Sequence, residues 1–458
     1  MIISVISLDR YGRLAKHHAI TLPPATFIVP MPKILNPKNR DGIERFSRLG
    51  SARAAAAFDL VSLPPEFYRN PYPWYHALRE HSPAKVLPEG SVFLSRYEDC
   101  RAVYSNSTLF SSDKKIEFAP KYGDSPLFEH HTSSLVFSDP PLHTRVRQVL
   151  VGALSPRAIA SLEASLIVAI DHLLDKIEDH PAPDLIIDFA SVIPIEVIGN
   201  LLGIPHDERG PLRDWSLAIL GALEPVLSSA QMHAGNTAVV EFKSYLKDLV
   251  AQRRANPLDT DVDVLTRLIQ SNQSDNYSAE HVALSENELM HNCIFLLNAG
   301  HETTTNLIGN GLEALLRFTN QRDLLILSPD LIKPAVEEFL RFESSNQLGN
   351  RRATAAFDIA GVSFVAGTRV HLGIGAANRD PAVFDRPDEL NISRSPNRHL
   401  AFGFGAHACA GLNLARLEGR VAISAWLARF PNYSLGGQVL RTGRVRFRGF
   451  AQLPIKLS

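Results

Sequence analysis

Cys409 is the residue of this chain whose surroundings best suit catalytic chemistry. Residues 402–411 read FGFGAHACAG and lead into a long helical pattern. Glycines let a backbone approach a flat cofactor closely, and N–H groups near a helix start stabilise the charge of a thiolate. The segment therefore predicts a thiolate metal ligand, although a cysteine taken alone is more often a small buried side chain in a turn.

The same run also mimics a dinucleotide-binding loop, G-x-G-x-x-A. That interpretation requires a preceding strand within a βαβ unit and an acidic residue about 20 positions later. Neither is evident in the sequence, so the metal-ligand interpretation is preferred.

A second candidate is the polar run AGHETTT at 299–305, which interrupts the apolar face of a long helical pattern. Such an interruption of a buried helix is costly unless function requires it. A zinc-protease motif is excluded because it needs a histidine where Thr305 stands. The run is thus a candidate functional segment; the alternative is a kink held by threonine hydroxyls bonded back to helix carbonyls.

Two further runs combine charged residues on one helix face. Residues 139–147 read DPPLHTRVR and predict a helix capped by Asp139, with His143 and Arg147 at i and i+4. Two cationic donors on one face suit carboxylates, and they also suit a solvated basic face. Glu338 and Arg341, at i and i+3, could form a salt bridge of ordinary surface type.

Together these runs resemble the cytochrome P-450 superfamily. The cysteine-loop pattern F-x-x-G-x-x-x-C-x-G is matched in full by Phe402, Gly405, Cys409 and Gly411. The other motifs follow in the family's order over about 400 residues. The resemblance implies a mainly α fold with small β-sheets, in which the haem lies between the long central helix and the cysteine-loop helix.

The resemblance also implies roles for individual residues. Cys409 would be the axial thiolate of a haem group (heme b). Gly300 would leave room for dioxygen, Thr303 would hydrogen-bond to it, and Glu302 would relay protons. The residues that would bind the haem propionates are His143, Arg147, Arg351 (in the run RRAT) and His407.

In the resembled family, the pair at Glu338 and Arg341 is buried behind the cysteine loop and has a third member, an arginine. Here the corresponding segment, residues 387–390, reads PDEL and lacks it. Either Arg386 or Arg394 could substitute, and the sequence does not distinguish them.

The helical patterns that must position these residues are long. We expect helices at about 141–153, 157–177, 192–203, 233–254, 286–318, 331–342 and 411–430, and strands near 84–95, 357–371 and 447–457. Residues 1–55 hold scattered prolines and no sustained period, so a poorly ordered extension is expected there. Residues 56–458 are expected to form a single domain.

Composition limits the class of protein. The chain has 458 residues and three widely spaced cysteines, so a reducing compartment is expected and a disulfide framework is not. Lys and Arg number 47 against 48 for Asp and Glu, which gives no electrostatic reason to expect nucleic acid as a partner. The apolar start MIISVISL is too short to span a membrane and lacks a secretory pattern. A cytoplasmic protein is expected.

The implied activity is a monooxygenase reaction that inserts one atom of O2 into a small, largely apolar substrate: a terpenoid, a steroid or a fatty-acid-like molecule. Electrons would come from a ferredoxin-like donor with its reductase, and the enzyme would act as a monomer. Arg416 and Arg420 are candidate donor contacts or an ordinary solvated face. The alternatives are a peroxygenase or isomerase, and a haem sensor or carrier.

The segment ESSNQ at 343–347 departs from the family, which often reads E-P-P there. Its serines would either hydrogen-bond an oxygenated group on the substrate or bond to the backbone.

Overall fold

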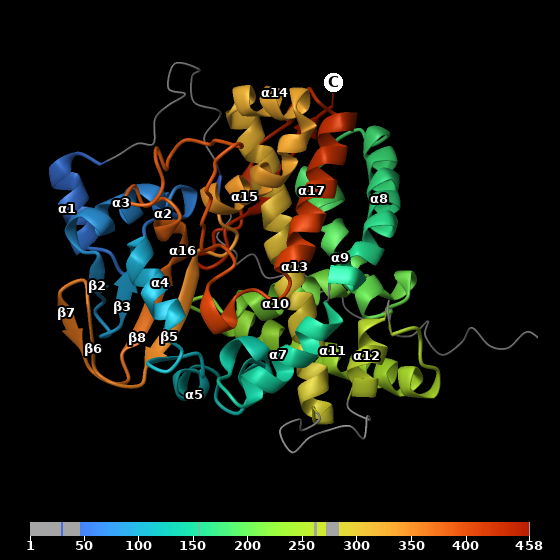
Figure 1. Cartoon of the computed structure of the whole chain (residues 1–458), viewed down its shortest axis with the longest axis horizontal. Coiled ribbons are helices and arrows are strands. Elements are labelled where there is room, and N and C mark those ends of the chain that lie inside the picture. The colour runs from blue at the N-terminus through green and yellow to red at the C-terminus, as the bar shows by residue number, and fades with distance from the viewer. Residues whose placement is uncertain (1–28, 31–45, 155, 261–262, 272–283, 458) are drawn as a thin grey trace, which may run out of the picture.

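The computed structural model describes residues 29–30, 46–154, 156–260, 263–271 and 284–457. The described part is mainly helical, with a sheet region at one end (Figure 1). The long helices are α8 (Pro156–Glu178), α11 (Ser229–Ala255), α13 (Glu286–Arg317) and α17 (Leu412–Arg429). The predicted fold class, mainly α with small β-sheets, is confirmed.

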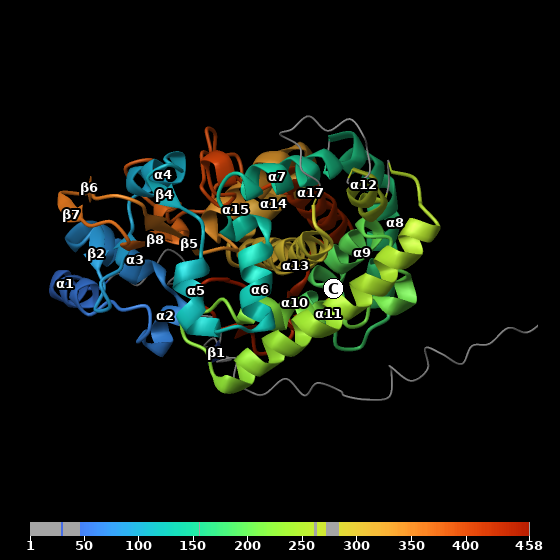
Figure 2. The ribbon, with the colours of Figure 1, turned by 90° about the horizontal axis from the view of Figure 1, so that it is seen from below.

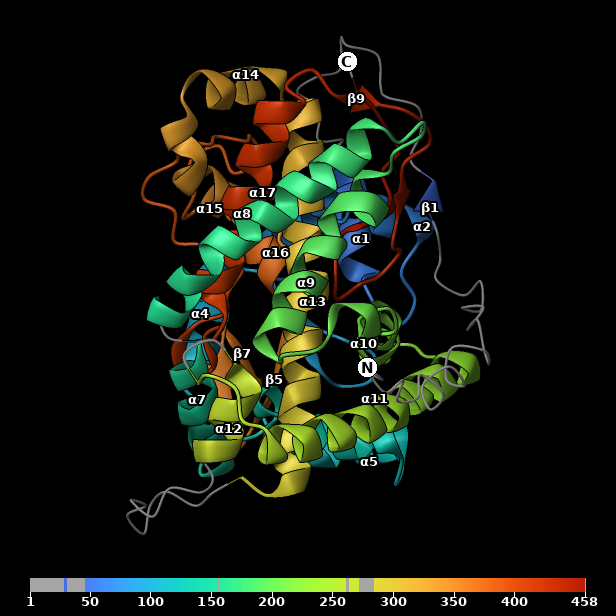
Figure 3. The same ribbon diagram turned by 90° about the vertical axis from the view of Figure 1, so that its right-hand side faces the viewer.

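The central element is α13, which runs the length of the helical part, with α11 crossing the half nearer its N-terminus (Figure 3). Ser285 begins the helix with a capping box: its hydroxyl accepts from Glu288 N, and the Glu288 carboxylate accepts from Ser285 N. This arrangement satisfies two N–H groups that a helix start otherwise leaves unpaired. In Figure 2, α13 lies in the middle of the other helices.

A continuous apolar core fixes α13 against α17. Leu307, Leu312 and Ile423 belong to it and are almost fully buried. The helix α17 also packs on α8. Its Trp426 ring lies 4.8 Å, between centroids, from the ring of Phe189 in the π-helical turn Leu185–Ala190. Burial of each such side chain stabilises the fold by about 1.5–3 kcal/mol. The core thereby sets where the N-terminus of α17, and the loop before it, lie relative to α13.

The larger sheet has five strands in the order β2-β3-β8-β5-β4, with β3 and β8 parallel and the other pairs antiparallel. Their bounds are β2 (Ala84–Val86), β3 (Val92–Leu94), β4 (Phe110–Ser111), β5 (Leu348–Ala353) and β8 (Arg369–Gly373). The small sheets pair β6 (Phe357–Ile359) with β7 (Val362–Phe364), β9 (Ser434–Leu435) with β12 (Ile455–Lys456), and β10 (Leu440–Arg441) with β1 (Val29–Pro30) and β11 (Phe450–Gln452).

Every helix expected from the sequence is present, within a few residues of its predicted ends. Besides the four long ones these are α7 (Leu142–Ala153), α9 (Val192–Leu201) and α15 (Ile332–Phe342). The sequence did not predict the shorter helices α2 (Pro65–Arg69), α3 (Tyr72–His81), α4 (Tyr97–Ser105), α5 (Lys115–Tyr122), α6 (Pro126–Ser133), α10 (Leu212–Gly221), α12 (Val264–Ser271), α14 (Thr319–Leu327) and α16 (Ile374–Ala377).

The N-terminal boundary differs from the prediction. A helix, α1 (Arg48–Ala56), packs on α3 and buries Ser51 and Ala55, so the expected boundary at residue 55 falls inside a folded helix. Most of the expected extension, residues 1–28 and 31–45, lies outside the described residues. The single domain expected over 56–458 stays a prediction. Within the described part of the chain, the helices are too short or too polar to cross a bilayer.

Candidate active site

The cysteine loop is held in place by a close approach to α4. Gly405 has a φ of +71°, and a Cβ atom there would lie 2.4 Å from the Tyr104 carbonyl oxygen, so only glycine fits. Cys409 N donates to Phe402 O at 2.8 Å and closes the loop. The helix α17 begins at Leu412, directly after it. The loop therefore presents Cys409 at the start of a long helix, as predicted.

Cys409 differs from the other cysteines in accessibility. Cys100 and Cys293 are fully buried, and burial raises the pKa of Cys293 to about 12. Cys409 is partly exposed. Desolvation also raises the pKa of its thiol, but the Gly411 N–H and the charge of Arg147 oppose this rise. Only Cys409 combines access with groups that favour a thiolate.

A cluster of cationic and imidazole side chains stands beside the loop. The rings of His143 on α7 and His407 lie 3.9 Å apart between centroids, and His143 Nε2 has no hydrogen-bond partner among the described residues. Burial and the neighbouring Arg351, His143 and Arg147 lower the pKa of His407 to about 3. The cationic groups of this cluster repel one another, and a bound dianion would relieve that repulsion.

Arg351 comes to this cluster from β5. Its Nη1 donates to the Asn350 carbonyl oxygen at 2.7 Å, and its guanidinium lies 5.0 Å from the ring centroid of Tyr104. Burial lowers the pKa of Arg351. The partners described for this buried guanidinium are a carbonyl oxygen and an aromatic ring, so its charge suits a carboxylate ligand. The four residues predicted to bind propionates, His143, Arg147, Arg351 and His407, are thus brought together near Cys409, and the donor set fits a haem.

The expected N-cap of α7 is wrong. The helix begins at Leu142, and the residue before it, Pro141, has no side-chain cap. The carboxylate of Asp139 instead accepts from Ser112 N at 2.8 Å and from the Ser111 hydroxyl. Asp139 therefore ties the start of α7 to the end of β4 and to the residue after it.

One face of α13 is open while its neighbours are buried. Phe295, Leu296, Ala299, Gly300 and Thr303 are partly exposed, and their spacing places them on one side of the helix. This open face is apolar except for Thr303. A Cβ atom at Gly300 would lie 2.9 Å from Ile198 Cδ1 on α9, so the glycine permits close packing of that helix. The predicted room for dioxygen at Gly300 stays a prediction.

Thr303 bonds back to its own helix. Its hydroxyl donates to Ala299 O at 2.6 Å, and Thr305 does the same to His301 O at 2.9 Å. This is the alternative that the sequence left open, and it does not exclude the catalytic one. A threonine hydroxyl that donates to a carbonyl keeps its lone pairs to accept a further hydrogen bond.

Glu302 is buried and paired. Both carboxylate oxygens lie 2.6 Å from Arg444 Nη1, and Arg444 Nη2 donates to Leu217 O on α10 at 3.1 Å. Burial raises the pKa of Glu302, and Arg444 opposes the rise. The sequence did not reveal Arg444, because it is 142 residues away and in no motif.

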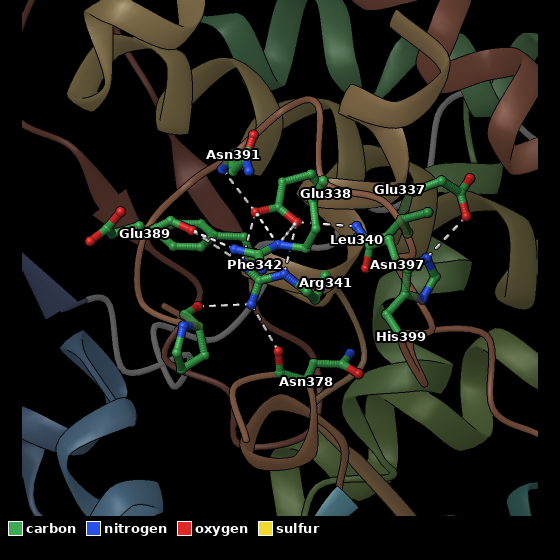
Figure 4. Close-up of polar contacts among 12 residues, drawn as sticks. Glu337, Glu338, Leu340, Arg341, Phe342, Asn378, Glu389, Asn391, Asn397 and His399 are labelled. Atoms are coloured by element: carbon green, nitrogen blue, oxygen red, sulfur yellow. Dashed lines mark hydrogen bonds and ion pairs between the residues drawn. The ribbon is translucent and has the colours of Figure 1, made fainter. Parts of the chain in front are cut away.

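The pair of Glu338 and Arg341 is fully buried, and Figure 4 shows its contacts. Arg341 Nε and Nη2 each donate to the Glu338 carboxylate at 2.8 Å. The third member is Arg394, whose Nε lies 3.0 Å from Glu338 Oε2. Arg386 is exposed and pairs with Asp385 instead. The structure thus chooses between the two candidates that the sequence left open.

The backbone around this pair is held by Arg341 as well. Its Nη1 donates to Asn378 O at 2.9 Å and to Pro387 O at 2.8 Å, and Asn391 N donates to Glu338 Oε1 at 2.9 Å. These bonds fix the course of the chain that leads to the cysteine loop.

Arg416 is committed to an ion pair. Its Nε and Nη2 donate to the two oxygens of Glu337 at 2.7 and 2.8 Å, and its guanidinium lies 5.0 Å from the Phe402 ring centroid. Arg420 Nε donates to Arg416 O at 3.3 Å. Arg416 therefore supports the cysteine loop, and its part in donor docking stays a prediction.

The polar segment after α15 is satisfied by protein groups. Ser344 donates to Leu340 O at 2.8 Å, and Ser345 donates to Thr303 O at 2.8 Å. Glu343 is buried and pairs with Arg448. These contacts support backbone bonding for the two serines rather than contact with a substrate.

Known proteins resemble this chain in sequence and in fold. A family model described as "Cytochrome P450" matches residues 215–319 and 330–438. The chain is 35% identical to a biotin biosynthesis cytochrome P450 of Bacillus subtilis, over 85% of this chain and 97% of that protein. It is 35% identical to a vitamin D(3) 25-hydroxylase of Pseudonocardia autotrophica, over 86% of this chain and 95% of that protein.

A solved structure of P450BioI in complex with hexadec-9Z-enoic acid ligated acyl carrier protein superposes with a TM-score of 0.79. The two share 34% sequence identity over 86% of this chain and 100% of that one. Relatives at this level match over nearly their whole length. The chain therefore belongs to the cytochrome P450 family of haem-dependent monooxygenases.

Proposed function

We propose that Cys409 would hold a haem through its thiolate, and that the open face of α13 would border the space in which dioxygen and substrate react. The observation that carries this proposal is the partly exposed Cys409 in a glycine loop that packs closely on α4, next to the cluster of His143, Arg147, Arg351 and His407. When bound, the haem supplies the activation of dioxygen, and one oxygen atom enters the substrate while the other leaves as water.

The chain's own residues would bind the haem, orient the reacting oxygen and supply protons to it. As a thiolate, Cys409 would donate electron density to the metal that it binds. Thr303, at the open face, would accept a hydrogen bond from the protonated reacting oxygen through its free lone pairs. Glu302 lies one residue before Thr303 on α13, and it would relay a proton only after its carboxylate turns away from Arg444. Positioned proton transfer of this kind accelerates a reaction by about 10²–10⁴-fold.

The substrate that we propose is small and largely apolar, such as a terpenoid, a steroid or a fatty-acid-like molecule. Phe295, Leu296 and Ala299 give the open face an apolar surface. The relatives named above point the same way, since one is a vitamin D(3) 25-hydroxylase and another was solved with a fatty acid carried on a protein. A ferredoxin-like protein with its reductase is the proposed electron donor.

Labelled dioxygen tests the proposed reaction. With ferredoxin, reductase and NADPH supplied, a candidate terpenoid or fatty acid is expected to gain one labelled oxygen atom from ¹⁸O₂. Product formed only with hydrogen peroxide, and without label from dioxygen, would instead identify a peroxygenase. Haem binding without any turnover across substrate classes would favour a sensor or carrier.

A further inference from the structure

Several buried polar side chains near the open face have no role in the proposed function. His130 and His131 come from α6, and His291 and Asn298 from α13. Each is at most 3% exposed. Neutral polar groups are costly to bury without partners, so a set of four in one place indicates a use for them.

Three of these residues form a line with an acidic residue on α6. Glu129 Oε2 lies 3.5 Å from His291 Nε2. The rings of His291 and His130 lie 5.5 Å apart between centroids, and His130 Nε2 lies 3.4 Å from Asn298 Nδ2. The line therefore alternates between the two helices, from Glu129 on α6 to His291 on α13, back to His130 on α6 and on to Asn298 on α13.

The outer end of the line reaches solvent. A surface cavity of about 230 Å³ lies between α6, α11 and α13, and Glu129, Lys243 and Met290 are among its lining residues. The Glu129 side chain is 45% exposed, and Lys243 Nζ lies 3.1 Å from its carboxylate. Glu129 can therefore exchange protons with bulk water.

The inner end of the line is Asn298 on α13, next in sequence to the residues of the open face. Asn298 lies three residues after Phe295 and one turn before Glu302, which places it at the edge of the open face. Glu302 itself is closed off by Arg444 through both carboxylate oxygens. The line from Glu129 reaches α13 one turn before Glu302 and does not include that ion pair.

The side chains of the line carry buried polar atoms that could hydrogen-bond to water molecules between them. His291 Nδ1, His130 Nδ1 and Asn298 Oδ1 are buried and have no hydrogen-bond partner among the described residues. An unsatisfied buried group of this kind costs about 1–3 kcal/mol, and a buried water makes about three hydrogen bonds to such groups. Water molecules between these atoms would join the side chains into a continuous hydrogen-bonded chain.

The imidazoles are in the protonation state that a relay needs. Burial, aided by Lys243, lowers the pKa of His291 to about 4, and burial lowers that of His130 as well. A neutral imidazole carries one N–H donor and one acceptor nitrogen. It can therefore accept a proton on one nitrogen while it releases the proton on the other.

We propose that Glu129, His291 and His130 carry protons from the surface cavity to the edge of the open face of α13, where Asn298 orients the last water. The inference rests on the proposed monooxygenase function. Each step breaks one O–H or N–H bond and forms the next. The two protons that dioxygen needs are matched by two electrons from the external donor, and the second oxygen atom leaves as water.

Proton exchange in the resting protein tests the route without any turnover. The haem-loaded, reduced carbon monoxide complex, labelled with ¹⁵N-histidine, reports the exchange rate of the His130 ring proton with solvent by NMR. We expect fast exchange in the wild type and at least tenfold slower exchange in His291→Gln and Glu129→Gln. The matched control is His301→Gln, because His301 is equally buried on α13 but its Nδ1 lies 3.1 Å from Ser216 Oγ on α10.

Two outcomes of that measurement overturn the route. One is slow exchange of the His130 proton in the wild type, which would show a sealed cluster. The other is equally fast exchange in the wild type and in His291→Gln, which would show that protons arrive elsewhere. An unchanged carbon monoxide spectrum in each variant verifies that the protein is folded with haem, so that neither outcome reflects misfolding.

Turnover then separates the route from the proposed function. In Glu302→Gln, residual coupled turnover would depend on the second route, so adding His291→Gln is expected to raise peroxide release per electron pair at least threefold. An equal peroxide yield in the single and double variants contradicts the route. The proposed function itself fails only if the wild type makes no product from dioxygen.

Discussion

At the scale of single residues, chemistry depends on how each side chain's hydrogen bonds are already used. Thr303 donates to Ala299 O and keeps its lone pairs at the open face of α13. Thr305 makes the same kind of bond to His301 O but is buried. The two threonines are therefore matched in chemistry and differ in access to the reaction site.

Thr303→Ala is expected to retain haem but to uncouple electron use from product formation, releasing peroxide. Its hydroxyl is the only side-chain hydrogen-bonding group on the open face of α13, so proton delivery there fails without it. Peroxide and product yields per NADPH measure the effect, and a severalfold rise in the ratio is expected. Thr305→Ala is the control, and coupling as tight in Thr303→Ala as in that control would refute the assigned role.

Single residues also show what sequence could reveal. The cysteine loop, the propionate residues and Glu302 could be found because they occur in short motifs. Arg444 could not, because its contact with Glu302 joins residues 142 positions apart that no local pattern connects. The same is true of Glu129 with His291, whose proximity depends on how α6 packs on α13.

At the scale of elements, periodicity revealed the long helices and missed the short ones. An amphipathic period is clear over the length of α13 or α8, but a helix of eight residues, such as α6, holds little more than two turns. The strand β5 was missed for another reason: its buried positions include Gly349, Asn350 and Arg351 instead of alternating apolar residues. Its buried arginine faces the propionate cluster, so function overrides the usual strand pattern there.

Arg394→Met is expected to destabilise the protein by about 2 kcal/mol, because the buried Glu338 carboxylate loses a charged hydrogen-bond donor. Arg386→Met is the matched control on the same segment, and loss of its exposed ion pairs should cost about 0–1 kcal/mol. Urea unfolding followed by circular dichroism measures both. Equal stability of the two variants would contradict the place of Arg394 in the network.

At the scale of the whole molecule, the apolar core packs α17, and with it the start of the helix after the cysteine loop, against α13. One charged side chain lies within this packing. Glu418 on α17 is 2% exposed, its Oε2 has no hydrogen-bond partner among the described residues, and burial raises its pKa to about 8. The carboxyl is therefore neutral in the folded protein near pH 7.

Glu418 should make stability fall as the pH rises. Because the pKa is higher in the folded than in the unfolded chain, the folded state binds the extra proton, and stability is lost between about pH 4.5 and 8. Glu418→Gln should remove this dependence, so its melting temperature should exceed that of the wild type by several degrees at pH 8 and match it near pH 5. Glu163→Gln, at an exposed site on α8, is the control; a wild type and Glu418→Gln with parallel pH profiles would contradict the assignment.

The central claim is that Cys409 is the axial ligand of the haem, and the absorption spectrum of the reduced protein with carbon monoxide tests it most directly. We predict a strongly red-shifted Soret band in the wild type that is lost in Cys409→Ala, while Cys100→Ala and Cys293→Ala keep it. A band typical of histidine-ligated haem in the wild type, or a red-shifted band that survives Cys409→Ala, would contradict the account.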